Sequence, residues 1–96
     1  MTQNISTQRV EEEKAAKNQV SFPFRSTCVA DACLIRTSSE CGSTAIEQLN
    51  HDETCTVNGW EGGCEYTDCG GDHVLWYNIQ RDNGRVGWVK AFCMDP

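Results

Sequence analysis

Seven cysteines offer the most obvious chemistry in this 96-residue chain. Cys28 and Cys33 are separated by four residues, and so are Cys64 and Cys69. Thiolates bind zinc well, so two such pairs could supply the four ligands of a tetrahedral site. Zinc-binding pairs more often have two intervening residues, and three further cysteines fit a single site poorly. We therefore expect disulfides and no metal.

The sequence gives little support for a catalytic nucleophile, a calcium site or a phosphate site. A cysteine could pair with His51 or His73, but both histidines lie in polar, turn-like segments and no oxyanion-hole motif is present. The alternating acidic pattern of a calcium loop does not occur. The glycine pairs Gly62-Gly63 and Gly70-Gly71 do not connect a strand to a helix, so they predict turns and not a phosphate cradle. We expect a protein that is not an enzyme and has no cofactor.

Aromatic residues offer binding chemistry instead. Aromatic rings stack on sugar faces and form the energetic centres of protein interfaces. The same residues also fill the core of a small barrel, and we expect that role for Tyr77. Side-chain alternation predicts that Trp76 and Trp88 are at least partly exposed. The full set is Trp60, Tyr66, Trp76, Tyr77 and Trp88.

Composition and charge limit the class of protein. The length allows one domain with a modest core. So many cysteines in a short chain are typical of secreted proteins, so we predict that this protein is secreted. Residues 1–14 lack the apolar centre of a signal peptide, so we expect that any signal has been removed or replaced. The chain has no run of about 18 apolar residues, so we expect no membrane insertion.

The charge is unevenly distributed along the chain. Residues 1–24 carry three basic and three acidic groups, whereas residues 25–96 carry five basic and eleven acidic groups. The whole net charge of −6 therefore lies on the second segment. Nucleic acids and anionic membranes are bound by clustered Lys and Arg, so neither is an expected partner. An acidic surface favours neutral glycans, amine-bearing peptides or basic proteins.

A hairpin near the C-terminus must position the aromatic residues. Residues 74–81 and 85–89 are rich in β-branched and aromatic residues and predict two strands. Asn83-Gly84 suits a tight type I′ turn between them. We expect Tyr77 and Ile79 to face inward. Because an isolated hairpin is marginally stable, the upstream chain must cover one of its faces.

The upstream segments predict further short strands. These lie at residues 27–29, 33–36, 45–49 and 53–57, and residues 58–72 predict a long irregular loop because they hold five of the eight glycines. This pattern indicates a small antiparallel barrel or sandwich at residues 25–96. Residues 1–24 predict a polar tail or pro-segment remnant, either mobile or forming a short helix.

Three segments occur in the order found in one known family. Residues 33–38 resemble its opening Leu-Asn-Val-Arg-Ser-Gly motif, and residues 46–57 resemble its middle part. Residues 76–79 and 87–89, Trp-Tyr-Asn-Ile and Gly-Trp-Val, resemble its closing signature. On these residues the chain resembles the bacterial-type SH3-like (SH3b) domain.

The resemblance implies an all-β fold, a small SH3-like antiparallel β-barrel, here stabilised by disulfides. Family members commonly bind cell-wall peptides or glycans. Lys90 stands where the eukaryotic peptide-binding version carries proline, so proline-rich ligands are not implied. The family's ligand groove is lined by the closing hairpin and by the loop after the first strand. The corresponding ligand-binding candidates are Trp76, Trp88, Ser38, Glu40 and Trp60.

Two hypotheses for function remain open. The first is a secreted, non-enzymatic binding module that recognises microbial cell-wall peptides or glycans in defence or targeting. The alternative is a small disulfide-rich effector, toxin or inhibitor that binds a protein surface.

We predict three disulfides within residues 28–93. Cys64–Cys69 is the expected local pair, and Cys28–Cys93 is expected to join the two ends of the domain. Cys33 and Cys55 are expected to point inward and pair. Cys41 is then the odd thiol, which allows a disulfide-linked dimer.

Overall fold

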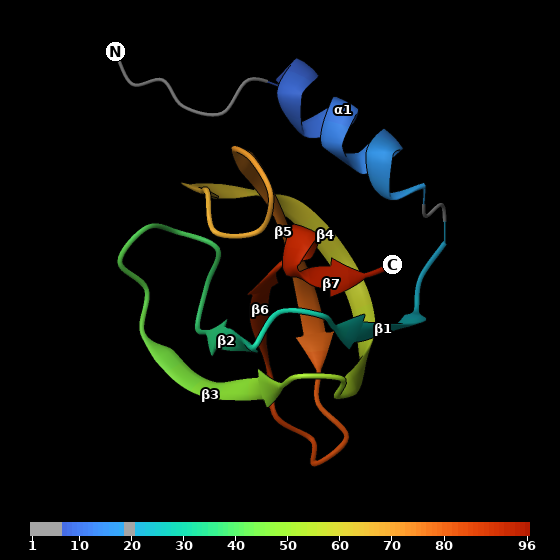
Figure 1. Ribbon diagram of the computed structural model, residues 1–96, viewed down its shortest axis with the longest axis vertical. Helices are drawn as coiled ribbons and strands as arrows, with labels where there is room; N and C mark the ends of the chain where they lie inside the picture. The colour runs from blue at the N-terminus through green and yellow to red at the C-terminus, as the bar shows by residue number, and fades with distance from the viewer. Residues whose placement is uncertain (1–6, 19–20) are drawn as a thin grey trace.

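The computed structural model describes residues 7–18 and 21–96. It shows one antiparallel sheet that curls on itself, with one α-helix across its upper end (Figure 1). This confirms the predicted all-β, barrel-like class. The elements are α1 (Thr7–Lys17), β1 (Phe24–Cys28), β2 (Ala32–Arg36), β3 (Ala45–Asn50), β4 (Thr54–Tyr66), β5 (His73–Gln80), β6 (Val86–Lys90), η1 (Ala91–Cys93) and β7 (Met94–Asp95). Hydrogen-bonded neighbours follow the order β3-β2-β6-β5-β4-β1-β7.

The core lies inside the curl, and alternation along β5 and β6 explains which side chains form it. Tyr77 and Ile79 are fully buried, as predicted, and Val89 lies opposite Tyr77. Gly87 lies opposite Ile79 on the same inner face. A Cβ at Gly87 would collide with Ile35 and with the backbone of β2, so glycine is needed for β2 to cross β6 this closely.

The turn between β5 and β6 differs from the predicted two-residue turn. Pairing ends at Gln80 and Val86, so residues 81–85 connect the strands. Gly84 has a positive φ of 97°, but Asn83 is not among the positive-φ residues. A type I′ turn requires positive φ at both central residues, so the predicted turn type is wrong. The Asn83 side chain instead accepts a hydrogen bond from the Arg85 N–H at 2.9 Å.

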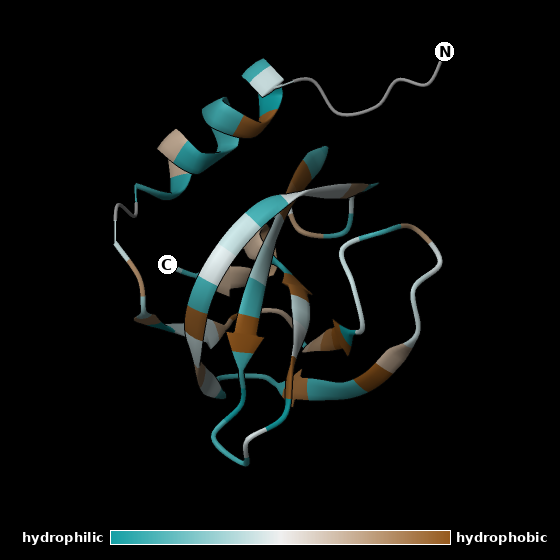
Figure 2. Ribbon diagram, turned by 180° about the vertical axis from the view of Figure 1, so that it is seen from behind, coloured by the Kyte–Doolittle hydropathy of each residue, from teal (hydrophilic) through white to brown (hydrophobic). Residues whose placement is uncertain are grey.

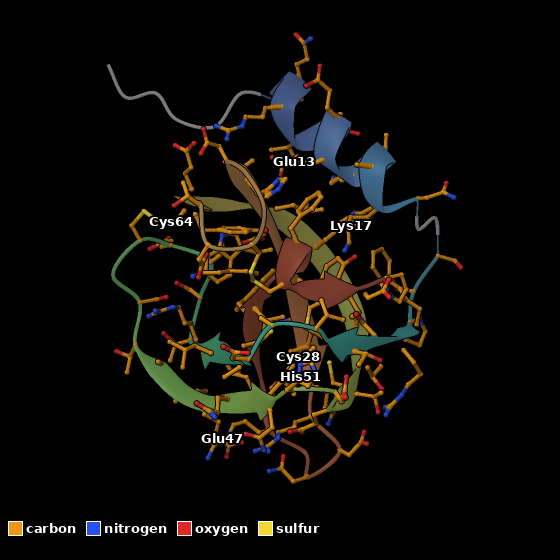
Figure 3. All side chains as sticks on the ribbon, viewed as in Figure 1. Glu13, Lys17, Cys28, Glu47, His51 and Cys64 are labelled. Atoms are coloured by element: carbon orange, nitrogen blue, oxygen red, sulfur yellow. A yellow bond between two sulfur atoms is a disulfide. The ribbon has the colours of Figure 1, made fainter. Side chains whose placement is uncertain are left out.

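Residues 58–66 of the predicted loop belong instead to strand β4, whereas residues 67–72 lie outside the strands, as predicted. Two register shifts along its pairing with β5 bend this strand. A Cβ at Gly63 would collide with Ser39, so glycine lets the loop at residues 37–44 lie directly on the bent strand. Figure 3 shows the result at Cys64, where β4 meets this loop.

Helix α1 packs over the N-terminal end of β5 (Figure 1), and most of its residues are hydrophilic (Figure 2). Polar contacts therefore hold it. Glu13, labelled in Figure 3, is only 8% exposed, and its carboxylate accepts hydrogen bonds from the N–H groups of Val74 and Leu75, each at 2.9 Å. The ammonium of Lys17 donates to the Met94 carbonyl at 2.8 Å.

The predicted tail is thus a docked helix over residues 7–17, which confirms the helical alternative. The mobile alternative for residues 1–6 and 19–20 lies outside the described residues. No helix of the described chain combines the length and apolar character needed to cross a membrane.

The disulfides differ from the predicted pairs. Cys41 bonds to Cys64 and Cys69 bonds to Cys93, with Cα–Cα distances of 4.8 and 5.3 Å. The predictions of Cys64–Cys69 and Cys28–Cys93 bonds, and of Cys41 as the odd thiol, are therefore wrong. The bend in β4 carries Cys64 toward the loop at residues 37–44, which sequence spacing does not reveal. The remaining cysteines, Cys28, Cys33 and Cys55, are buried thiols. The predicted Cys33–Cys55 bond is therefore absent too.

Candidate functional site

Two adjoining hollows lie on either side of the Cys41–Cys64 disulfide. The larger, of about 490 Å³, is lined by residues 39–41 of the loop and 61–65 of β4. The smaller, of about 260 Å³, is lined by residues 40–42 and 64–66 together with Arg36, Trp76 and Lys90. We call the two together the loop–β4 groove.

The loop side of the groove is held by hydrogen bonds that serine residues donate and accept. Ser39 is buried, its carbonyl accepts the Cys64 N–H at 2.7 Å, and its hydroxyl donates to the Glu61 carboxylate at 2.6 Å. The Ser38 hydroxyl accepts the Glu40 N–H at 3.1 Å. The disulfide and these bonds fix the loop against β4, so the groove is preformed.

Two aromatic residues form the inner wall of the smaller hollow. The Trp76 indole N–H donates to the Cys64 carbonyl at 2.8 Å, and the ring contacts Tyr66 edge-on at 5.6 Å between centroids. The Tyr66 hydroxyl donates to the Leu75 carbonyl at 2.6 Å. Burial raises the pKa of Tyr66, so its hydroxyl stays a neutral hydrogen-bond donor. The wall is therefore apolar and uncharged.

The two hollows differ in charge. The lining of the larger one includes Glu40, Glu61 and Glu65 and contains no Lys or Arg. Glu65 is paired with Arg9 of α1 at 2.9 Å, whereas no ion pair involves Glu40 or Glu61 within the described residues. This half of the groove suits a cationic group on a ligand.

The smaller hollow is of mixed charge. Its two cations have partners, because Arg36 donates to the Ser43 carbonyl at 2.8 Å and Lys90 pairs with Asp68 at 2.8 Å. The hydrogen bond from Lys90 lowers the pKa of the Asp68 carboxyl. Lys90 also lies over the Tyr66 ring at 5.6 Å. This half can accept a ligand carboxylate or carbonyl beside an aromatic wall.

Of the predicted site residues, Glu40 lines both hollows and Trp76 lines the smaller one. Trp76 does point to the face opposite Tyr77, but it is only 2% exposed, because the bent end of β4 and Tyr66 cover it. The prediction that it is partly exposed is wrong. Ser38 lies beside the groove and supports the loop turn.

Trp60 and Trp88 lie outside the groove. Trp60 stacks on Tyr77 and contacts Phe22 edge-on, with Lys14 of α1 over its ring at 5.6 Å. Trp88 is half-buried on the outer face, in register with Asn78, and lines neither hollow. The predicted set of five residues is therefore not brought together.

The groove residues that the sequence did not indicate come from β2, β4, β6 and the loop. Glu61 and Lys90 lie in register with Trp76 on adjacent strands, so all three share the outer face. The glycine pair Gly62-Gly63 was the one sequence feature that could have indicated the groove, because glycine in a strand often marks a place where another backbone segment approaches closely. The residues missed are Arg36, Ser39, Glu61, Glu65, Tyr66 and Lys90.

The described residues do not form a metal site or a nucleophilic catalytic site. The ligand atoms of Asp68, Cys69 and Cys93 lie within 4.8 Å of one another, but both sulfurs belong to a disulfide and are not thiolate ligands. Burial raises the pKa of Cys55 to about 12, which makes it a poor nucleophile. His51 is exposed, with Nδ1 3.0 Å from the Ala30 carbonyl oxygen, and His73 stacks on Phe92.

Comparison with protein-family models, curated proteins and solved structures finds no match to this chain. The case for a function therefore depends on the groove itself.

Proposed function

We propose that this protein is a secreted, non-enzymatic binding module and that its loop–β4 groove takes amine-bearing peptides of microbial cell walls. The observation that carries the proposal is the acidic hollow beside a buried aromatic wall, with both fixed by the Cys41–Cys64 disulfide. A preformed groove of this kind binds without paying the entropy of ordering a loop.

The chemistry of the groove favours a peptide over a neutral glycan. Glu40 and Glu61 present carboxylates that no Lys or Arg neutralises within the described residues, so a ligand ammonium would be attracted there. A carboxylate or amide of the same ligand would meet Arg36 and Lys90 in the adjoining hollow. Cell-wall peptides carry amines and carboxylates a few bonds apart, which matches this arrangement.

Two features support the proposal, one for secretion and one for the ligand. The chain contains two disulfides, and disulfides persist in oxidising compartments. The SH3b resemblance of residues 33–94 also supports a cell-wall ligand, since family members commonly bind such material.

The alternative, an effector or inhibitor that binds a basic protein, uses the same acidic surface. Pull-down on insoluble peptidoglycan and on chitin, beside a protein-array screen, separates the alternatives. The proposal predicts retention on peptidoglycan and none on chitin. A single protein hit without retention on peptidoglycan supports the alternative.

A pair of matched variants tests whether the groove is responsible for retention on peptidoglycan. Glu40→Gln and Asp31→Asn remove the same charge, but Asp31 is exposed in the turn after β1 and lines neither hollow. Removing one exposed ionic contact weakens binding by roughly two- to fivefold. We expect this loss of retention for Glu40→Gln only. An equal loss in both variants would show that overall charge, and not the groove, binds the polymer.

A further inference from the structure

The sulfur atoms of Cys28 and Cys33 are closer than two unbonded thiols should be. Their Sγ atoms are 2.7 Å apart, and both residues are buried, at 0% and 4% exposure. Non-bonded carbon atoms rest about 3.5–4.0 Å apart, and sulfur is larger than carbon. In a disulfide the sulfurs are about 2.0 Å apart, so a small side-chain rotation would bring this pair to bonding distance.

This pair lies where β1 and β2, each one strand in from an end of the sheet, come together. β1 and β2 are joined by residues 29–31, yet β6, β5 and β4 separate them in the hydrogen-bonded order. No ladder joins β1 to β2, so the curl of the sheet is not closed by strand pairing at this seam. Figure 3 shows Cys28 at this point, close to both strands.

Backbone hydrogen bonds hold the seam on both sides of the pair. The Cys28 carbonyl accepts the Asp52 N–H at 2.8 Å, and the Val29 N–H donates to the Cys93 carbonyl at 3.0 Å. The Cys33 sulfur lies 3.4 Å from that same Cys93 oxygen. The two cysteines are therefore fixed by the fold in facing positions.

We propose that Cys28 and Cys33 form a third disulfide, which closes the curled sheet covalently at this seam. The oxidant is a low-molecular-weight disulfide such as oxidised glutathione. One cysteine thiolate attacks it and releases one reduced glutathione. The other cysteine then displaces the second glutathione, so the protein loses two hydrogens and the oxidant leaves as two thiols.

The timing of this step follows from burial. Burial raises the pKa of Cys33, so the attacking thiolate is scarce once the protein has folded. The bond therefore forms during folding, before the sulfurs are covered.

The odd cysteine is then Cys55. It is fully buried on β4 opposite Ser26, and no other sulfur contacts it among the residues that the structure describes. A fully buried thiol cannot reach a second chain. The proposal therefore predicts a folded protein without a disulfide-linked dimer.

Mass spectrometry of the full chain, refolded in a glutathione redox buffer, tests the proposal. The protein is denatured without reductant and alkylated with iodoacetamide. We expect one carbamidomethyl group, located at Cys55. Three groups, located at Cys28, Cys33 and Cys55, would overturn the proposal.

Peptide mapping then identifies the partners. Trypsin releases residues 26–36, which contain both cysteines, and cleavage before Asp31 separates Cys28 from Cys33. The two fragments should stay together until a reductant is added. Fragments that separate without reductant, or a bond from either cysteine to Cys55, contradict the assignment.

Two variants serve as controls for the number of alkylated cysteines. Cys55→Ser should take up no label and should keep the linked fragments, since it removes only the odd thiol. Cys28→Ala should take up two labels, at Cys33 and Cys55, and this count is read in denaturant whether or not the variant folds. Loss of the linked fragments in Cys55→Ser would contradict the proposal.

Discussion

The indole nitrogen of Trp76 donates a hydrogen bond to the carbonyl oxygen of Cys64 at 2.8 Å. Through this bond a buried side chain of β5 holds the residue that carries the groove's disulfide. Trp76 thus forms part of the buried wall of the groove, and at 2% exposure its main role is to support the groove's shape.

Trp76→Ala should therefore destabilise the protein. Removing a buried tryptophan leaves a cavity, and the expected cost is about 3–5 kcal/mol in the free energy of unfolding. Trp76→Phe keeps much of the packing and loses the hydrogen bond, so it should cost less. Denaturant unfolding measures both. An unchanged unfolding curve for Trp76→Ala, together with lost binding, would instead show a ligand-contacting tryptophan.

The sequence predicted the strands well because their apolar alternation is local. Tyr77 and Ile79 fell on the inner face for that reason. Exposure of the outer face was not predictable, since it depends on what another segment covers. Trp76 is hidden by the far end of β4, whose bend arises from register shifts that composition does not encode.

The predictions of the cysteine pairs were wrong for a related reason. Sequence spacing favours local partners, whereas Cys41 and Cys64 meet only because Gly63 lets the loop lie on the strand. The acidic character of the groove was implied by the net charge, but its location required the fold. Glu40 was found through the family resemblance, and Glu61 through the structure alone.

Gly63→Ala should open the groove. Its new methyl group would collide with Ser39, and relief of that clash should cost about 1–3 kcal/mol of stability. Gly59→Ala is the matched control on the same strand, because a Cβ there meets no atom within 4 Å. Thermal unfolding of both variants checks this. Equal melting temperatures would show that the loop does not need the close contact.

Glu13→Ala should release α1 from the sheet. The change removes the acceptor of the Val74 and Leu75 N–H groups and the carboxylate 3.4 Å from His73 Nδ1. Leaving such donors unpaired costs about 1–3 kcal/mol. Hydrogen exchange should accelerate at these two amides. The exposed Glu12→Ala is the control and should leave their exchange unchanged; the same acceleration in both variants would contradict specific docking.

Stability should fall in acid through the ion pairs of Arg81. Its hydrogen bonds hold the pKa of Glu47 and of Glu53 below the usual 4.5. Because both folded-state pKa values are depressed, this stabilisation is complete above about pH 4.5 and is lost as the pH falls through them. Arg81→Gln should therefore flatten the acid limb of a stability–pH profile. A profile as steep as that of the unchanged protein would assign the acid sensitivity to other carboxylates.

The most direct test of the loop–β4 groove is a two-dimensional amide NMR titration of the full chain with a soluble, lysine-containing cell-wall stem peptide. We expect saturable shifts concentrated at residues 39–42 and 61–66 and at the Trp76 indole N–H. We also expect Glu40→Gln to weaken the binding and Asp31→Asn to leave it unchanged. Shifts confined to the turn at residues 81–85 or to the helix α1 surface, or no saturable shifts at all, would contradict the proposed binding site.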